Sequence, residues 1–292
     1  MKNLILILLA LFVFNSCKGQ EKEEKNANQK ITSHPKEHKV LYENGQIKEQ
    51  GNYDKNGEAT GEWKEYYEDG QLKSVGNYIN GNASGEWTFY EENGKKIFFF
   101  KDGEKNGKYT AYHTNDKIAV EGSYNDGKET GEWKRFNNKG QLWLIGSYKN
   151  GKQIGVWKEF YDNGQLNYVE NYENGERAGE KMKYTEDGKL SSKSIYKNDV
   201  EHFEEYYDNG KVYLIGINVK GLKNGEWKYY YENGQSMSFG YYKNSVKVGE
   251  WKYYHENGKP KSVNYFANDG FRIGIWKNYD ENGQLYETIS YE

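Results

Sequence analysis

The chain has little of what many enzymes and disulfide-bonded exported proteins depend on. Among its 292 residues there are one cysteine, two prolines and five histidines. The single cysteine, Cys17, excludes an intramolecular disulfide and a thiolate metal cluster. The formal net charge of -3 gives no basic surface for nucleic acid. Helical periodicity is absent after residue 20, which excludes a fold of alternating strands and helices.

The first twenty residues have the pattern of an export signal. An apolar run over residues 4–14 has the length of a signal-peptide core and is too short to span a bilayer as a stable helix. The lone Cys17, directly after a small residue, resembles the lipobox of bacterial lipoproteins. This resemblance implies that residues 1–16 are removed and that Cys17 is lipidated. Phe14 and Asn15 depart from the usual motif, and an ordinary secretory signal with an incidental cysteine is the alternative.

Residues 17–38 contain no aromatic side chain and almost nothing apolar. Such a composition cannot bury enough surface to offset chain entropy, so it predicts a flexible tether. Together with the signal and Cys17, it predicts an exported protein that a lipid anchor holds on the periplasmic face of a membrane or on the cell surface.

The rest of the chain is a repeat with three anchors. A turn glycine recurs at Gly45, Gly70, Gly94, Gly140, Gly164, Gly188, Gly210, Gly234, Gly258 and Gly283, with Asp116 in the missing slot. The second anchor is Trp63, Trp87, Tyr109, Trp133, Trp157, Lys181, Phe203, Trp227, Trp251 and Trp276. The third is mostly tyrosine, as at Tyr53, Tyr78, Tyr124 and Tyr148, with Asn218 the polar exception. One period maintained over about 250 residues indicates a repeat array.

Within a unit such as GEWKEYYEDGQLKSVGNY, residues 61–78, two aromatic-rich runs flank a three-residue loop with glycine last. That loop predicts a type I turn followed by a left-handed residue, which is a bulged hairpin connection. The second link, as in residues 79–85, predicts another reversal. We therefore expect an all-β fold over residues 39–292, an elongated array of about 10 or 11 β-hairpins in one continuous antiparallel meander.

Aromatic residues are 17% of the chain and about half of its hydrophobic residues, so stacked rings must replace an aliphatic core. Tyr66 and Tyr67 are adjacent and point to opposite sides of a strand, so both faces of the sheet carry rings. The sheet is then either one exposed layer or one that curls on itself.

The unit G-E-W-x-x-Y-Y-E-[ND]-G-Q-L-K-x-x-G-x-Y, found at residues 61–78 and 225–242, resembles the MORN-repeat variant family. The resemblance covers about residues 40–292. It implies an elongated sheet of successive hairpins and a scaffold or binding role. Bacterial members are often described as antitoxin components, which implies neutralisation of a toxin by direct binding as an alternative.

Three departures, Asp116, Lys181 and Asn218, predict units that are less regular as hairpins. A separate irregularity is the apolar run at residues 97–100. Phe98 and Phe99 in this run are either buried in a twisted pair of strands or part of an exposed partner surface.

No motif for catalysis is recognisable. The stretch GEKNGK at residues 103–108 has too few residues between its glycines for a phosphate loop. The histidines have no metal-ligand spacing; they are His34, His38, His113, His202 and His255. The acidic residues beside every turn are those that turns favour. We therefore predict no catalytic residue, no cofactor and no metal site.

These observations predict a non-catalytic, lipid-anchored scaffold that binds a protein or an envelope glycan, without nucleic acid. An antitoxin or immunity protein that neutralises a toxin by direct binding is the alternative. The two ends of the sheet are open strand edges, at which a further strand can pair. The oligomeric state stays open.

Overall fold

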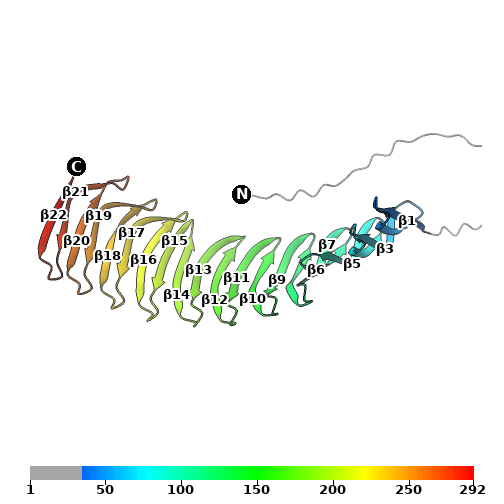
Figure 1. Ribbon diagram of the computed structural model, residues 1–292, viewed down its shortest axis with the longest axis horizontal. Coiled ribbons are helices and arrows are strands. Elements are labelled where there is room, and N and C mark those ends of the chain that lie inside the picture. The colour runs from blue at the N-terminus through cyan, green and yellow to red at the C-terminus, as the bar shows by residue number, and fades with distance from the viewer. Residues whose placement is uncertain (1–34) are drawn as a thin grey trace, which may run out of the picture. The chain divides into compact units, whose positions relative to one another are not determined.

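The computed structural model describes residues 35–292, so the predicted signal peptide and Cys17 lie outside the described residues. In the described part, 22 strands and no helix form a single antiparallel sheet (Figure 1). Each strand pairs with the next one along the chain, from β1 with β2 to β21 with β22. The predicted meander of β-hairpins is therefore confirmed.

The strands are short and evenly spaced along the chain. The first eleven are β1 (Lys36–Leu41), β2 (Ile47–Tyr53), β3 (Ala59–Tyr66), β4 (Leu72–Ile79), β5 (Asn82–Glu91), β6 (Gly94–Lys101), β7 (Glu104–Tyr112), β8 (Ile118–Asn125), β9 (Lys128–Phe136), β10 (Leu142–Lys149) and β11 (Lys152–Phe160). The others are β12 (Leu166–Glu173), β13 (Glu176–Tyr184), β14 (Leu190–Lys197), β15 (Val200–Tyr206), β16 (Val212–Val219), β17 (Leu222–Tyr230), β18 (Ser236–Lys243), β19 (Val246–Tyr254), β20 (Pro260–Phe266), β21 (Arg272–Tyr279) and β22 (Leu285–Tyr291).

The sheet begins at Lys36, three residues before the expected boundary at residue 39. The reason is that the first unit is complete. His38 pairs with Gly51 in the same register in which Trp63 pairs with Gly76. Its ring stacks on Trp63 at 5.1 Å between ring centroids. His38 is thus the first member of the second anchor.

The two kinds of reversal have the predicted geometry. The Gly70 amide donates to the Tyr67 carbonyl at 2.9 Å, and Gly70 is left-handed at φ +86°. This is a type I turn closed by a left-handed glycine. The links between units are mostly two-residue turns in which both residues have positive φ, as at Asn80 (+49°) and Gly81 (+75°). Asp116 adopts the left-handed conformation in place of glycine, at φ +60°, and its hairpin forms normally.

The G-E-W motif is a bulge that places the tryptophan. Along β18 and β19, Tyr241 pairs with Val248 while Phe239 pairs with Lys252, so β19 carries two more residues than its partner. The bulge turns Trp251 back over Gly240, where a Cβ atom would overlap the indole ring. The indole Nε1 donates to the Tyr241 carbonyl at 3.1 Å.

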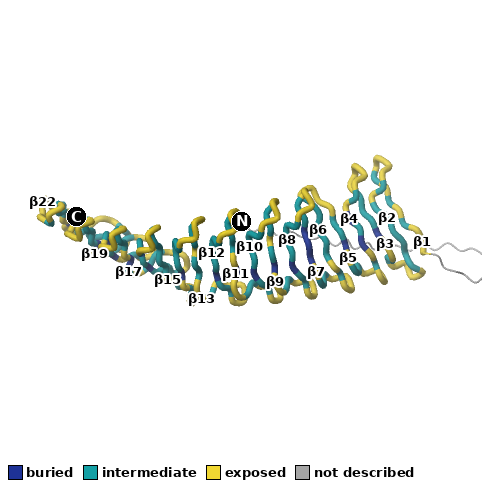
Figure 2. The backbone as a smooth tube through the Cα atoms, turned by 90° about the horizontal axis from the view of Figure 1, so that it is seen from below, coloured by how far each residue is buried: buried dark blue, intermediate teal, exposed yellow. Residues whose placement is uncertain are grey.

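A core therefore forms on one face of a single layer. We call the face that carries His38 and the second anchors the aromatic face. Trp227 and Trp251 are only 1% exposed there, and Figure 2 shows the buried residues in the middle of the strands. Edges of tyrosine or phenylalanine rings flank these indoles, as Tyr148 and Tyr172 flank Trp157 at 5.1 and 6.1 Å. Of the two arrangements expected, one exposed layer is what residues 35–292 form.

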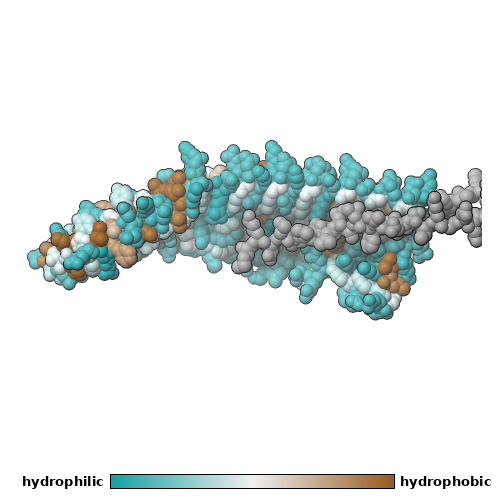
Figure 3. Space-filling model, turned by 90° about the horizontal axis from the view of Figure 1, so that it is seen from above, coloured by the Kyte–Doolittle hydropathy of each residue, from teal (hydrophilic) through white to brown (hydrophobic). Residues whose placement is uncertain are grey.

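The opposite face carries both rings and charged side chains, and Phe239 stacks there on Tyr254 at 6.0 Å between ring centroids. It carries Glu–Lys pairs on single strands, such as Glu226 with Lys228 and Glu250 with Lys252, both at 3.0 Å. Such exposed pairs contribute little stability. On the side of the molecule seen in Figure 3, hydrophilic side chains predominate and hydrophobic ones gather in small separate patches.

Side chains in the turns bind one unit to the next. Asn233 accepts a hydrogen bond from the Gln235 amide within its own turn at 2.8 Å and donates one to the Glu256 carbonyl of the next turn at 3.0 Å. The Tyr231 hydroxyl likewise donates to the Tyr254 carbonyl at 2.8 Å. The acidic and amide residues beside the turns are thus structural. Within residues 35–292 no helix has the length and apolarity needed to cross a membrane.

Candidate functional site

The row of rings on the aromatic face is interrupted once near the middle of the sheet. Contacts between aromatic side chains run from His38 through Trp63, Trp87 and the later anchors to Tyr172, and they resume at Phe203. Between these points Lys181 occupies the position of the tryptophan. The hairpin of β13 and β14 that carries Lys181 is nevertheless paired along its length.

Lys181 has a partner at the position where the other units have glycine. Glu170 on β12 is opposite Lys181, just as Gly146 lies under Trp157. Its carboxylate is 3.1 Å from the Lys181 ammonium and 3.2 Å from Nε of Arg177, and it accepts a hydrogen bond from the Tyr172 hydroxyl at 2.7 Å. The Glu170 side chain is only 4% exposed. A buried carboxylate with two cations thus replaces the Gly–Trp pair.

The next unit also lacks the regular Gly–Trp pair. Ser194 stands at the glycine position, opposite Phe203, and its hydroxyl donates to Glu201 at 2.6 Å. Glu201 also accepts hydrogen bonds from the Tyr196 hydroxyl at 2.8 Å and from the Asn218 amide at 2.9 Å. Asn218 stands where most units have a tyrosine, and its shorter side chain donates to this carboxylate.

Burial and neighbouring polar groups shift the pKa values of Glu201, Tyr196 and Arg177. Burial alone would raise the pKa of Glu201, but the hydrogen bonds from Ser194, Asn218 and Tyr196 lower it below its ordinary value. Burial, reinforced by Glu201, raises the pKa of Tyr196 to about 12. Burial would lower the pKa of Arg177, but the charge of Glu170 together with Tyr172 and Tyr196 outweighs this and raises it. Near neutral pH, Glu201 is therefore ionised, Tyr196 is neutral and Arg177 is a cation.

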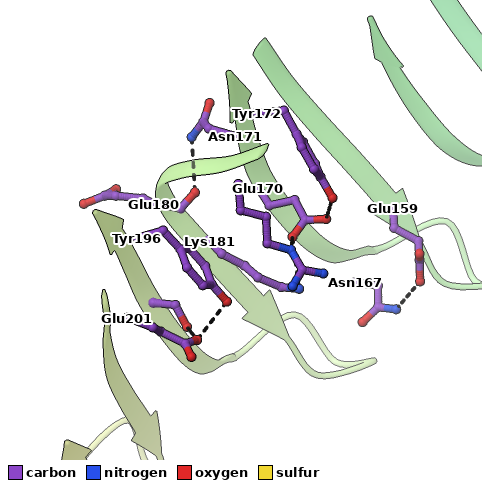
Figure 4. A network of polar contacts seen from close by, with 11 residues as sticks. Glu159, Asn167, Glu170, Asn171, Tyr172, Glu180, Lys181, Tyr196 and Glu201 are labelled. Carbon is purple, nitrogen blue, oxygen red and sulfur yellow. Dashed lines mark hydrogen bonds and ion pairs between the residues drawn. The ribbon is translucent and has the colours of Figure 1, made fainter. Parts of the chain in front are cut away.

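Figure 4 shows two groups of polar contacts on neighbouring strands, one around Glu170 and one around Glu201. We call the following residues of β12 to β16 the polar belt: Glu170, Tyr172, Arg177, Lys181, Ser194, Tyr196, Glu201 and Asn218. Sequence reasoning noted Lys181 and Asn218 only as irregularities. It missed Glu170 and Ser194, although both interrupt a column of glycines. Because their partners lie on neighbouring strands, the network is visible only once the register is known.

An open hollow of about 790 Å³ borders the belt. It lies between the link turn of β12 and β13 and the link turn of β14 and β15. Belt residues Arg177 and Tyr196 line it together with Asn174 and Asn198 of the two turns and the acidic residues beside them. Arg177 is half-exposed in the hollow and is held from behind by Glu170.

Phe98 and Phe99 do not form one surface, because they lie on opposite faces. Phe98 is on the aromatic face, 4.7 Å from Tyr109 between ring centroids and 4.0 Å from the Lys105 ammonium. Phe99 lies on the other face and is 48% exposed. A partner role thus stays a prediction for Phe99, and Phe98 belongs to the packed row.

The histidines lie apart from one another. His113 and His255 take the place of turn tyrosines, with Nε2 2.9 Å from the Phe136 carbonyl and 3.0 Å from the Tyr279 carbonyl. His202 is exposed on the face opposite the belt, while His34 lies outside the described residues. In the part of the chain that the structure describes, no group of three His, Cys, Asp or Glu side chains is placed to hold a metal ion.

Eleven hairpins joined by tight turns, with a tryptophan column on a glycine column, define a β-hairpin repeat protein. The chain belongs to the MORN repeat variant family, which matches it at nine segments covering more than half of its length. The matched segments are residues 36–55, 59–80, 105–126, 129–150, 153–174, 177–198, 223–244, 247–268 and 272–292. A comparison with curated proteins finds no match.

The two long unmatched stretches inside the sheet, residues 81–104 and 199–222, contain the two short units. Phe203 follows its link turn at Asn198 by five residues, whereas Trp157 follows Asn150 by seven. The missing residues are those of the bulge, so β14 and β15 pair without a register shift. In the other short unit the shortening lies in the hairpin turn instead, where Glu91 pairs with Gly94 and β5 and β6 have no register shift, while the bulge between β6 and β7 is kept. The short unit that carries Phe203 contributes Glu201 and Asn218 to the polar belt.

Proposed function

We propose that this chain is an exported, lipid-anchored repeat scaffold that binds a protein or an envelope glycan and performs no catalysis. The observation that supports the proposal best is the polar belt. In a row whose other members are mostly rings packed on glycine or on one another, it buries a carboxylate where the regular unit has a stabilising Gly–Trp pair.

The energetics favour a role beyond folding. Burying Glu170 beside Lys181 and the half-exposed Arg177 removes the carboxylate from water, and well-packed apolar side chains in the same place are often as stable or more stable. The carboxylate Oε2 has its two ion pairs but no well-directed hydrogen bond. The belt therefore stabilises the sheet less than a regular Gly–Trp pair does. We attribute its presence to a binding site next to it.

The same network argues for binding without catalysis. A general acid or base needs a pKa near the working pH and a free approach to the substrate. Hydrogen bonds keep the pKa of Glu201 low, and burial raises that of Tyr196. Glu170 is enclosed by its partners. The charged groups of the belt are thus engaged with one another and hold a fixed arrangement.

Localisation in this proposal depends on Cys17 and the apolar run before it, which lie outside the described residues. The first experiment uses a chain that starts at residue 18. It retains all 22 strands, whose pairs form among themselves. Immobilised, it is exposed to a detergent extract of the cell envelope of its native organism.

We expect one protein or one polysaccharide to be retained and to be released by an excess of the soluble chain. If the column retains nothing more than a control column that carries a chain of scrambled sequence, the proposal is contradicted. A single retained protein that is toxic when expressed alone and harmless with this chain would instead favour the antitoxin alternative.

A further inference from the structure

The polar belt leaves two tyrosines without the ring that normally stands between them. In a regular unit the indole is held edge-on by the tyrosines before and after it, as Trp133 is by Tyr124 at 5.4 Å and Tyr148 at 5.7 Å. Around Lys181 the corresponding tyrosines, Tyr172 and Tyr196, are both present. Their hydroxyls turn to Glu170 and Glu201. The hollow opens beside Tyr196.

We infer that this hollow binds a neutral saccharide, with the ring of Tyr196 against the C–H face of a pyranose and polar groups of the two link turns on its hydroxyls. The inference rests on the proposed binding function and names its site and ligand class. A sugar hydroxyl both donates and accepts hydrogen bonds. The rim offers both kinds of group: Arg177 donates, Asn174 and Asn198 do both, and Glu173 accepts.

Buried groups hold the ligand-facing residues in place. Glu170 fixes Arg177 through the 3.2 Å ion pair, and Glu201 fixes Tyr196 through the 2.8 Å hydrogen bond. A binding site gains affinity when the residues that contact the ligand are held by supporting contacts before it arrives. This accounts for the position of both carboxylates: each lies behind one residue of the hollow.

The composition of the rim favours an uncharged sugar over a charged one. Acidic side chains at Glu173, Glu176 and Asp199 stand among the basic ones of Arg177 and Lys197. Charges of both signs at close range give no field that would select an anion or a cation. The rim carries no aliphatic side chain larger than Ala178. A protein partner, which needs a desolvated apolar anchor point, fits it less well.

The test is calorimetric titration of the chain from residue 18 with neutral hexasaccharides, namely cellohexaose, chitohexaose and mannohexaose. Galacturonic acid and glucosamine hexamers are the charged counterparts. We expect at least one neutral hexamer to bind at least tenfold more tightly than both charged ones. Binding of none of the neutral hexamers, or equal binding of charged and neutral ones, would overturn the inference.

Repeat symmetry supplies matched control variants. Arg177→Gln and Asn174→Ala should each weaken binding at least tenfold. Arg272→Gln and Asn150→Ala change the same repeat positions in other units, since Arg272 lies over Trp276 and Asn150 is in the equivalent link turn. Both should leave binding within twofold. Equal losses in the belt variants and their controls would place the sugar elsewhere on the sheet.

A double variant separates ligand binding from folding. Glu170→Gly with Lys181→Trp rebuilds the regular unit, fills the space between Tyr172 and Tyr196 and removes the support of Arg177. We expect it to fold with unchanged far-ultraviolet circular dichroism and to lose binding at least tenfold. Undiminished binding would contradict the site. If the column captures one protein while no neutral hexamer binds, the saccharide inference fails and the proposed function stands. If the column captures nothing and no neutral hexamer binds, the proposed function and the saccharide inference both fail.

Discussion

The indole ring of Trp227 covers the backbone of Gly216 on the preceding strand, and its Nε1 donates to the Ile217 carbonyl at 3.2 Å. The same relationship recurs between Trp251 and Gly240 and between Trp157 and Gly146. Where the tryptophan is absent the glycine is absent too, as in the pairs Lys181 with Glu170 and Phe203 with Ser194. In these units the two positions vary together because they share one space, whereas before Trp276 the glycine position holds Asn264.

Gly216→Ala should destabilise the sheet by about 1–3 kcal/mol, the usual cost of forcing extra atoms into a packed site. The added Cβ overlaps the indole of Trp227 and must displace it. Urea unfolding followed by tryptophan fluorescence measures the effect. Asn264→Ala is the matched control, because Asn264 already occupies this position before Trp276 and has a buried oxygen without a partner. A loss at Asn264 as large as the loss at Gly216 would contradict the shared-space argument.

Tyr231→Phe removes the hydroxyl that donates to the Tyr254 carbonyl of the next unit. We expect a loss of about 1 kcal/mol, the typical net contribution of one hydrogen bond. The adjacent Tyr230 makes no side-chain hydrogen bond with residues 35–292, so Tyr230→Phe should be nearly neutral. Urea midpoints of the two variants, compared at one protein concentration, decide the matter. If both variants behave alike, the turn tyrosines do not bind the units together.

The hairpins could be predicted because their signals are local. A turn such as Glu68–Asp69–Gly70 specifies its own geometry, and the fixed period carries that geometry along the chain. The single-layer core could not be predicted, because it depends on the bulge at the G-E-W motif. The bulge brings Trp251 over Gly240, and alternation along a strand alone does not show this.

The polar belt could not be predicted from the sequence for a similar reason, because its contacts depend on how the strands pair. Lys181 was recognisable as a departure, but Glu170 is eleven residues earlier and joins it only through the register of β12 and β13. Arg177 and Glu201 had no repeat anchor to mark them. A comparison of the glycine column with the tryptophan column would have found the pair, since Glu170 and Lys181 depart from the two columns at matching positions.

Alkaline pH should weaken the fold between about pH 10 and pH 12. Burial raises the pKa of Tyr124, Tyr196 and Tyr242 to about 12, above the unfolded value of about 10. A raised folded-state pKa gives stability that is fully present below pH 10 and is lost as the unfolded chain releases its protons first. The urea midpoint should therefore be constant below about pH 9 and fall above pH 10. A midpoint that stays constant up to pH 12 would show that these tyrosines titrate alike in both states.

Cys17→Ser should move the protein from the membrane fraction to the soluble exported fraction. A lipid on Cys17 would hold the chain by burying its acyl carbons, each CH₂ contributing about 0.8 kcal/mol. Fractionation and mass spectrometry of the N-terminal peptide provide the measurement. Ser16→Ala keeps a small residue before the cysteine and should remain in the membrane fraction. The same distribution for the parent and Cys17→Ser would indicate an ordinary secretory signal.

A double-mutant cycle at positions 170 and 181 tests whether the belt is a substituted Gly–Trp pair. Lys181→Trp alone should destabilise the protein, because the indole overlaps the Glu170 side chain and the carboxylate loses its lysine. Glu170→Gly alone leaves Lys181 and Arg177 without their counter-charge. Removing one partner from a buried ion pair typically costs about 3–5 kcal/mol, whereas replacing the whole pair by packed apolar groups is neutral or stabilising by about 1–4 kcal/mol.

The double variant should therefore be at least as stable as the parent, although each single change weakens it. Chemical unfolding of all four proteins gives the interaction energy. Additive losses would mean that the introduced indole does not reach position 170 and that the belt differs from the regular unit in backbone as well as in side chains. A favourable interaction energy with a double variant more stable than the parent would instead show that the sheet gives up stability at the belt, as expected if these charges are kept for a ligand.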